Sequence, residues 1–151
     1  MARAPLNVLV LLFRRTAEGP EFAVLRRADE AGDVWQGVAG GAEDDESPLG
    51  AARREFFEET GVSAERLWVG LQARCSVPAV VFAAWKDWPP DLYVVEEHAF
   101  AVELVADDAI VLSKEHAEVR WLPYEDAHAL LRWDSNRTAL WELNARLTGT
   151  R

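Results

Sequence analysis

The sequence predicts an α/β fold in which a mixed β-sheet is covered by helices on both faces, an α/β/α sandwich. Two apolar, β-rich segments come first, an acidic helix follows in the middle, and a group of strands precedes two closing helices. Helices placed both between and after the strands can cover opposite faces of one sheet. A length of 151 residues fits one domain with a real core, so we expect a single domain over residues 1–151.

Composition and charge are those of a soluble globular protein with an acidic surface. Half of the residues are hydrophobic, 28% are charged, and the formal net charge is −10. This charge argues against non-specific binding to nucleic acid or to an anionic membrane, but bound cations can reverse the local sign for a phosphorylated substrate. Cys75 is the single cysteine, which excludes an internal disulfide and fits a reducing cytosol.

The first residues do not form a secretory signal, because Arg3 and Pro5 precede an apolar run that is too short. No stretch of the sequence is long and apolar enough to span a membrane. We therefore expect a cytoplasmic protein. The sequence does not indicate an oligomeric state.

Two strands open the chain. Residues 7–13 (NVLVLLF) form a run that is continuously apolar after Asn7, which is typical of a strand covered on both faces. A polar turn separates them from a second strand over 21–26. A loop over 29–33 and a short extended segment over 38–39 follow, and a glycine turn begins at Gly40.

The next element is a helix with clear start and stop signals. Ser47 suits the N-cap, and Pro48 suits the first helical position, where a missing N–H costs nothing. Helix-forming residues continue to Thr60, and Gly61 provides the C-terminal stop. An apolar flank that includes Phe56 gives this helix a surface to bury.

Extended segments and two helices complete the chain. The extended segments are expected over 66–77, 80–85, 97–105, 110–112 and 119–122. The alternation in 97–105 predicts a half-buried strand. Pro123 begins a helix that continues to Leu131, and Asp134 or Ser135 caps a terminal helix with leucines at three- and four-residue spacing.

Acidic residues are concentrated in and before the central helix. From Glu43 to Glu59, seven acids stand against two arginines, a net charge of −5. Glu55, Glu58 and Glu59 fall within an arc of about 100° on the helix. This density suits a hard divalent cation that is shared with substrate phosphates. Taken alone, the three glutamates fit a solvated acidic face equally well.

The spacing of these residues resembles the signature of one family. Gly40, Glu46 and the segment Arg54-Glu55-Phe56-Phe57-Glu58-Glu59-Thr60-Gly61-Val62 fit the Nudix box at all nine defined positions over twenty-three residues. The chain is thus identified as a member of the Nudix hydrolase family. The resemblance implies an α/β/α sandwich, as the order of elements does independently. It also implies a metal-dependent hydrolase that cleaves a diphosphate linked to another moiety.

The resemblance also implies roles for the residues of the box. Glu55, Glu58 and Glu59 match the metal-binding glutamates, with Mg²⁺ or Mn²⁺ as the cofactor. Arg54 matches the arginine that orients them. These four residues are the catalytic candidates within the box.

Two further positions of the box match supporting roles. Glu46 matches an early glutamate that supports the metal ligands without binding the metal itself. The backbone around Gly40 is expected to turn a carbonyl toward the metal, which would explain the glycine there.

The family usually supplies one more carboxylate from outside the box, as a metal ligand or a general base. Glu115, in the loop before the last expected strand, is the candidate here. Carboxylates that bind a cation are poor proton acceptors, so a base has to come from another element. If Glu115 is an ordinary surface residue, Glu96 or Glu97 is the alternative.

A narrower resemblance concerns the substrate. Five segments look like bacterial dihydroneopterin triphosphate pyrophosphohydrolases: Arg26-Arg27, Trp35-Gln36, Glu115-His116, Trp121-Leu122 and Trp133-Asp134-Ser135-Asn136-Arg137. Residues 77–96 depart from that pattern. The resemblance implies substrate contacts from Arg26, Arg27, Trp35, Asn136 and Arg137. A solvated strand end, core packing and a helix cap are the alternative roles for these side chains.

Three functions remain open from the sequence. The first is release of pyrophosphate from a pterin triphosphate or a (deoxy)nucleoside triphosphate. The second is hydrolysis of a dinucleoside polyphosphate, ADP-ribose or a nucleotide sugar. The third is a binding module that has lost catalysis, which the complete set of glutamates disfavours. The expected partner is a small phosphorylated molecule, with neither nucleic acid nor membrane involved.

Overall fold

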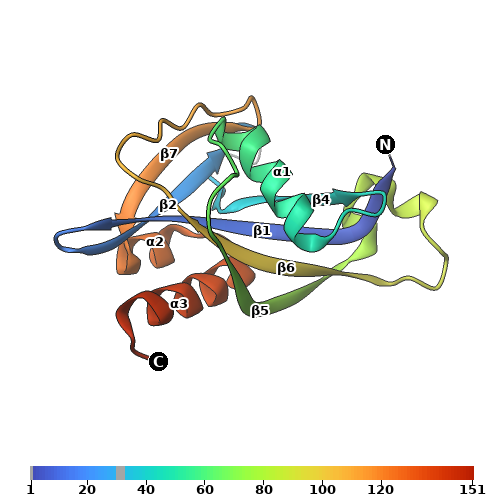
Figure 1. The fold of residues 1–151 in the computed structure, drawn as a ribbon. Helices are drawn as coiled ribbons and strands as arrows, with labels where there is room; N and C mark the ends of the chain where they lie inside the picture. Colours follow the sequence, from blue (N-terminus) through green and yellow to red (C-terminus); the bar gives the residue numbers. More distant parts are fainter. Residues whose placement is uncertain (1, 30–32) are drawn as a thin grey trace.

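The computed structural model describes residues 2–29 and 33–151 and shows one β-sheet between helices (Figure 1). Part of the loop expected over 29–33 lies outside the described residues. The elements are β1 (Arg3–Thr16), β2 (Gly19–Arg27), β3 (Trp35–Gln36), β4 (Val38–Glu43), α1 (Pro48–Thr60), β5 (Trp68–Pro78), η1 (Ala79–Val81), η2 (Ala83–Asp87), β6 (Val94–Glu103), β7 (His116–Pro123), α2 (Tyr124–Leu130) and α3 (Asp134–Thr148). None of the helices in the described part of the chain is long and apolar enough to cross a membrane.

The sheet is built around β1. This strand runs parallel to β6 and antiparallel to β2 and β4, with β4 along its first part and β2 along its last. On the far side, β5 pairs with β6, while β3 and β7 both pair with β2. One parallel pair among antiparallel ones makes the sheet mixed, as the sequence predicts.

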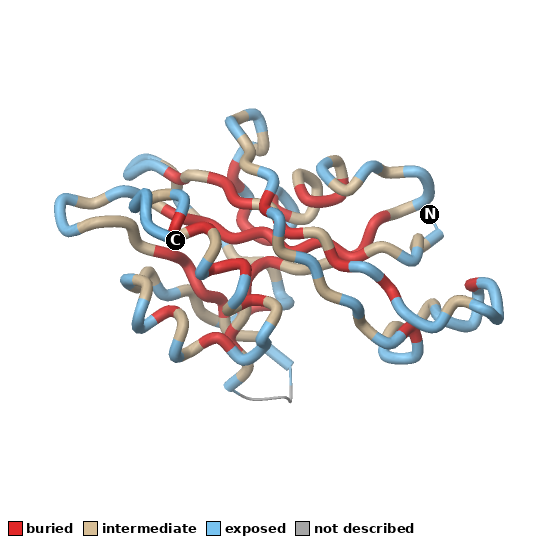
Figure 2. The backbone as a smooth tube through the Cα atoms, turned by 90° about the horizontal axis from the view of Figure 1, so that it is seen from below, coloured by how far each residue is buried: buried red, intermediate tan, exposed pale blue. Residues whose placement is uncertain are grey.

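β1 is buried on both faces, as its continuous apolar run predicts. On one face Val10 packs in a cluster with Phe56 of α1, and on the other Leu11 packs in a cluster with Leu140 of α3. Figure 2 shows the buried segments, in red, running through the middle of the sheet. The α/β/α arrangement is therefore confirmed, and β1 is held between the helix of the box and the terminal helix.

The ends of α1 follow the expected signals. The Ser47 hydroxyl accepts a hydrogen bond from the backbone N–H of Gly50 at 3.0 Å. Gly61 adopts a left-handed conformation with φ of +69° and donates its N–H to the carbonyl of Phe57 at 2.9 Å. Because the side chain of Phe56 is fully buried, the helix is fixed in rotation, and the adjoining flank carries the glutamates.

The strand expected over 80–85 is absent from the described structure. The ladder between β5 and β6 ends at Pro78 opposite Val94, so the intervening residues connect two antiparallel neighbours and turn back. They form the short helices η1 and η2, with Val80 and Val81 exposed. Their β-branched side chains suggested a strand, but the residues coil into these two short helices and do not pair with the sheet.

Other elements differ from the expectation in detail. β6 is buried on both faces, because Ala99 and Ala101 lie in the cluster under α3. β4 continues through Gly40, so the turn starts only near Asp44, whose φ is +47°. Residues 110–112 form no regular strand.

The cap of the terminal helix also differs from the expectation. Trp133 occupies the N-cap of α3 and makes no side-chain cap, so neither Asp134 nor Ser135 caps this helix.

Two adjacent phenylalanines test the rotation of α1. Phe56 is fully buried and meets Trp68 edge to face at 5.4 Å, whereas Phe57 is 56% exposed. We expect Phe56→Ala to lower the free energy of unfolding by about 3–5 kcal/mol. Phe57→Ala, the matched control, should change it by roughly 0.5 kcal/mol or less. Urea denaturation of both variants measures this, and equal losses would contradict the orientation of α1.

Candidate active site

Arg54 is the centre of the charged network on α1. Its Nε and Nη2 donate to the two carboxylate oxygens of Glu46 at 2.8 and 3.0 Å, and Nη2 also donates to the carbonyl of Gly41 at 2.8 Å. Its Nη1 donates to Glu55 at 3.1 Å and to Glu58 at 3.2 Å. One planar guanidinium thus joins the helix, the turn before it and strand β4.

Glu46 holds Arg54 from the side away from the other glutamates. The hydrogen bonds from Arg54 lower the pKa of Glu46, so this carboxylate stays charged. It also accepts the backbone N–H of Glu43 at 2.9 Å. This geometry matches the supporting role that the family resemblance implies for Glu46.

Glu55 lies directly against Gly40. A Cβ atom added at Gly40 would lie 2.2 Å from Cδ of Glu55, so the glycine leaves the space that this carboxylate fills. Burial raises the pKa of Glu55 to about 7, although the neighbouring Arg54 acts in the opposite direction. The reason for glycine at position 40 is therefore steric room for a carboxylate, whereas the sequence suggested only the direction of a carbonyl.

Glu59 is the buried member of the three glutamates, with only 4% of its surface exposed. The Ser113 hydroxyl donates to it at 2.9–3.0 Å, and Nδ1 of His116 lies 2.9 Å from its Oε2. Burial lowers the pKa of His116, so the neutral ring with its proton on Nδ1 satisfies this carboxylate. Glu58, by contrast, keeps a side chain that is 51% exposed.

Glu115 belongs to the same neighbourhood as Glu59. Its backbone N–H donates to the Ser113 hydroxyl at 3.2 Å, and its carbonyl accepts from the N–H of Ala28 at 2.9 Å. Burial, followed by the charge of Glu59, raises the pKa of the Glu115 carboxyl. The loop before β7 thus brings a proton-binding carboxyl group to the end of α1.

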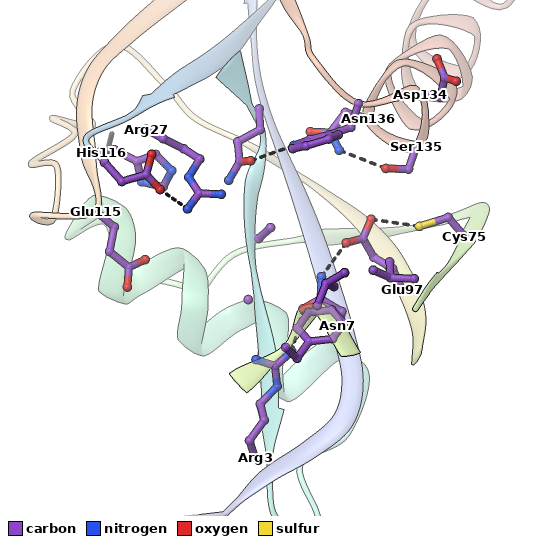
Figure 3. Close-up of a pocket in the computed structure, with 18 of the residues that line it drawn as sticks. Arg3, Asn7, Arg27, Cys75, Glu97, Glu115, His116, Asp134, Ser135 and Asn136 are labelled. Carbon is purple, nitrogen blue, oxygen red and sulfur yellow. Dashed lines mark hydrogen bonds and ion pairs between the residues drawn. The ribbon is translucent and has the colours of Figure 1, made fainter. Parts of the chain in front are cut away.

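A cavity of about 1140 Å³ opens beside this cluster (Figure 3). Among the site residues expected from sequence, Arg27, Gly40, Glu115 and Asn136 line it. Asn136 is 4% exposed and accepts the N–H of Gly37 at 2.8 Å, which fixes the connection between β3 and β4 to α3. Several lining residues were not identified as site residues from sequence: Arg3, Asn7, Cys75, Lys114, Ser135 and His116.

Three of the expected substrate contacts lie outside the lining of this cavity. Arg26 reaches the other way and pairs with Glu118 at 3.4 Å. Trp35 is 4% exposed and packs in the core under the guanidinium of Arg120. Arg137 donates to the carbonyl of Leu131 at 2.7 Å, beside the N-terminus of α3. The geometry thus supports their alternative roles as a strand end, a core residue and a helix-terminus contact.

The donor set fits a hard divalent cation in its chemistry. The groups around Gly40 are carboxylate and carbonyl oxygens, which Mg²⁺ and Mn²⁺ prefer. In residues 2–29 and 33–151, however, no three acidic, histidine or cysteine side chains already converge on one point. Arg54 instead holds Glu55 and Glu58, and Ser113 holds Glu59.

Fold and site together define the class: an α/β/α sandwich in which glutamates of one helix lie next to a cavity that Gly40 and Glu115 line. Residues 3–141 match the profile of the NUDIX domain, so the chain belongs to that family, and the resemblance read from the box is confirmed. Members of this family generally use a divalent cation such as Mg²⁺.

Two solved structures share this fold along nearly the whole chain. A protein of Listeria monocytogenes described as a NUDIX hydrolase is 41% identical, with a TM-score of 0.86 over 97% of this chain and 96% of that one. The dihydroneopterin triphosphate pyrophosphohydrolase of Escherichia coli is 25% identical, with a TM-score of 0.76 over 97% of this chain and 99% of that one.

Two sequence relatives match the chain over very different shares of their own length. The dihydroneopterin triphosphate diphosphatase of Haemophilus influenzae is 28% identical over 89% of this chain and 84% of its own length. An octanoyltransferase of Myxococcus xanthus is 41% identical over 69% of this chain. The chain spans only 27% of the length of that second relative, so this match concerns one part of a longer protein.

The contact between Gly40 and Glu55 gives a direct prediction. Gly40→Ala places a Cβ atom where the Glu55 carboxylate lies, so we expect the affinity for Mn²⁺ to fall about tenfold or more with the fold retained. Gly70→Ala is the control, because no atom lies within 4 Å of its added Cβ. Calorimetric titration with Mn²⁺ measures both variants. Unchanged affinity in Gly40→Ala would contradict the steric explanation.

The raised pKa of Glu55 predicts how metal binding depends on pH. With a pKa of about 7, Glu55 is protonated in mild acid and must lose that proton to bind a cation. The affinity for Mn²⁺ should therefore rise between about pH 5.5 and 7, by up to roughly tenfold per pH unit, and level off above. Glu55→Gln should weaken binding and flatten this profile. A wild-type profile that is flat over this range would show that Glu55 is already ionised.

Proposed function

We propose that this chain releases pyrophosphate from a pterin triphosphate or a nucleoside triphosphate in a reaction that requires Mg²⁺ or Mn²⁺. The observation that carries the proposal is a cavity of about 1140 Å³ that is lined by Glu115 and by Gly40, against which Glu55 of the helix lies. A cavity of this size can hold a ring system and a triphosphate tail. The diphosphatase named among the relatives supports the same substrate class.

Glu55, Glu58 and Glu59 would hold the cation, with Glu115 as a possible fourth ligand. When bound, the cation stabilises the charge that develops on phosphate oxygens. Arg54 keeps two of these carboxylates in place. Ser113 and His116 fix the buried Glu59 at the end of α1.

Glu115 is the proposed acceptor of the proton from the attacking water. Its carboxyl lines the cavity, and its pKa is raised by burial and by Glu59, which makes it a better base than an ordinary glutamate. The water then attacks a phosphorus atom in line with the leaving group. If Glu115 is instead a metal ligand, its substitution should also lower the affinity for the cation.

Basic side chains of the cavity would receive the phosphate tail. Arg27 and Lys114 line the cavity, and neither belongs to the network around Arg54. Cationic groups beside a carboxylate cluster suit a phosphate chain that bridges them and the metal. Asn136 would act indirectly, because its carboxamide holds Gly37 and so shapes the wall.

An assay of products tests the proposed function. With a nucleoside triphosphate or dihydroneopterin triphosphate, we expect pyrophosphate and a monophosphate with Mg²⁺ present, and no turnover in excess EDTA. Orthophosphate as the first product, or two mononucleotides from a dinucleoside polyphosphate only, would favour the alternative substrates. Full activity in EDTA would contradict the metal requirement.

A matched pair of carboxylates tests the role of Glu115. Glu115→Gln should lower kcat about 10²-fold or more, the usual range for a general base. Glu118→Gln is the control, since Glu118 lies on β7 outside the cavity lining and pairs with Arg120. If Mn²⁺ affinity is retained, Glu115 acts as the base, and if affinity falls as well, it is a ligand. Activity of Glu115→Gln within about threefold of wild type would remove Glu115 from the site.

A further inference from the structure

Glu97 is a buried carboxylate in the wall of the cavity, away from the Nudix box. It lies on β6 with 8% of its surface exposed, and the cavity lining includes it. Figure 3 shows Glu97 and Glu115 on opposite sides of this space. A molecule that fills this space would therefore meet the two carboxylates at different ends.

The partners of Glu97 are uncharged. The amide Nδ2 of Asn7 donates to its Oε2 at 2.5 Å, and the Cys75 thiol lies 3.5 Å from its Oε1. Burial, followed by the charge of Glu97, raises the pKa of Cys75 to about 11, so the thiol keeps its proton and donates it. Within residues 2–29 and 33–151, no basic side chain forms an ion pair with Glu97.

The orientation of Asn7 is fixed from its other end. Nη2 of Arg3 donates to Oδ1 of Asn7 at 3.1 Å, which leaves the amide nitrogen to face Glu97. Arg3 itself lies over the Phe82 ring, with 4.8 Å to the ring centre. The carboxylate of Glu97 is thus held by a chain of contacts and cannot turn freely toward solvent.

Two acceptor positions of Glu97 remain for a ligand. A carboxylate offers about four lone-pair sites, and the two known donors use two of them. A buried carboxylate without a cation is costly unless further donors reach it. The site therefore favours a ligand with two adjacent N–H donors and no acceptor between them.

We propose that Glu97 selects substrates whose ring carries a 2-amino-4-oxo edge, by accepting hydrogen bonds from the ring N–H and from the adjacent amino group. Pterins have this edge, and guanine presents the same donors and acceptor as a 2-amino-6-oxo edge. Adenine and cytosine would turn a ring-nitrogen lone pair toward the carboxylate, and uracil has one N–H between two carbonyl oxygens. The inference rests on the proposed function and deepens it by naming the substrate class.

The position of Glu97 agrees with the placement of the phosphate tail. A ring held at Glu97 can direct its substituent across the cavity toward Glu115, which lies on the opposite side. Apolar side chains, among them Val81 and Phe82, line the same cavity and can cover the faces of the ring. Recognition of the ring edge and hydrolysis of the tail can thus take place in one bound pose.

Rates of pyrophosphate release on four triphosphates test the inference. Wild type should prefer GTP and dihydroneopterin triphosphate over ATP in kcat/KM by roughly 10- to 100-fold, the discrimination of one bidentate pair. It should also prefer GTP over ITP, which lacks only the 2-amino group. Glu97→Gln should remove most of the preference for GTP and leave ATP unchanged or better, because an amide can pair with the N1 and N6 positions of adenine.

Glu96→Gln is the matched control. Glu96 is the preceding residue of β6, lies outside the cavity lining and contacts His98 at 2.7 Å, so its variant should keep the wild-type preference. The comparison of GTP with ITP needs no variant and remains informative if Glu97→Gln does not fold. An equal loss for all substrates in Glu97→Gln, or a wild type that treats GTP, ITP and ATP alike, would overturn the inference.

A binding measurement separates this inference from the proposed function. Calorimetric affinities for GDP and ADP do not depend on turnover, and we expect GDP to bind about tenfold or more tightly. Absence of pyrophosphate release from every triphosphate would refute the proposed function while leaving this comparison valid. Equal affinities for GDP and ADP would overturn the role of Glu97 whether or not the chain is active.

Discussion

The hydrogen-bonded fork of Arg54 is the interaction on which the rest of the site depends. Three glutamates on neighbouring turns of one helix repel one another, and burial makes the charge on Glu55 costlier still. Arg54 offsets this by contacting Glu46, Glu55 and Glu58 together, and its contact with the Gly41 carbonyl ties α1 to β4. The positive charge of Arg54 therefore limits the repulsion among these glutamates when no cation is bound.

The fold places the two proposed parts of the binding site, one for the ring and one for the diphosphate, on two neighbours of β1. The first half of β1 pairs with β4, which carries Gly40, and with β6, which carries Glu97. The cavity extends between these neighbours, so the carboxylate that fits a ring edge and the cluster that fits a diphosphate share one rigid support. Selection of the ring can then position the scissile phosphorus without a separate domain or lid.

What the sequence could predict was local. The ends of α1 and the common flank of its glutamates follow from helix geometry and capping, and they were predicted correctly. The contact of Asn7 with Glu97 could not be predicted, because it depends on the register of β1 against β6 across 90 residues. The feature of the sequence that could have indicated this contact was Asn7, a polar residue within an apolar strand. The burial of Glu59 likewise depends on a distant loop.

Measurement of Mn²⁺ affinity in Arg54→Lys tests the central claim most directly. Lysine keeps the positive charge but cannot donate to three carboxylates and a carbonyl from one planar group. If the fork organises the site, affinity should fall about 10- to 100-fold while circular dichroism shows an intact fold. An affinity equal to that of wild type would show that charge alone is sufficient, and would contradict the account.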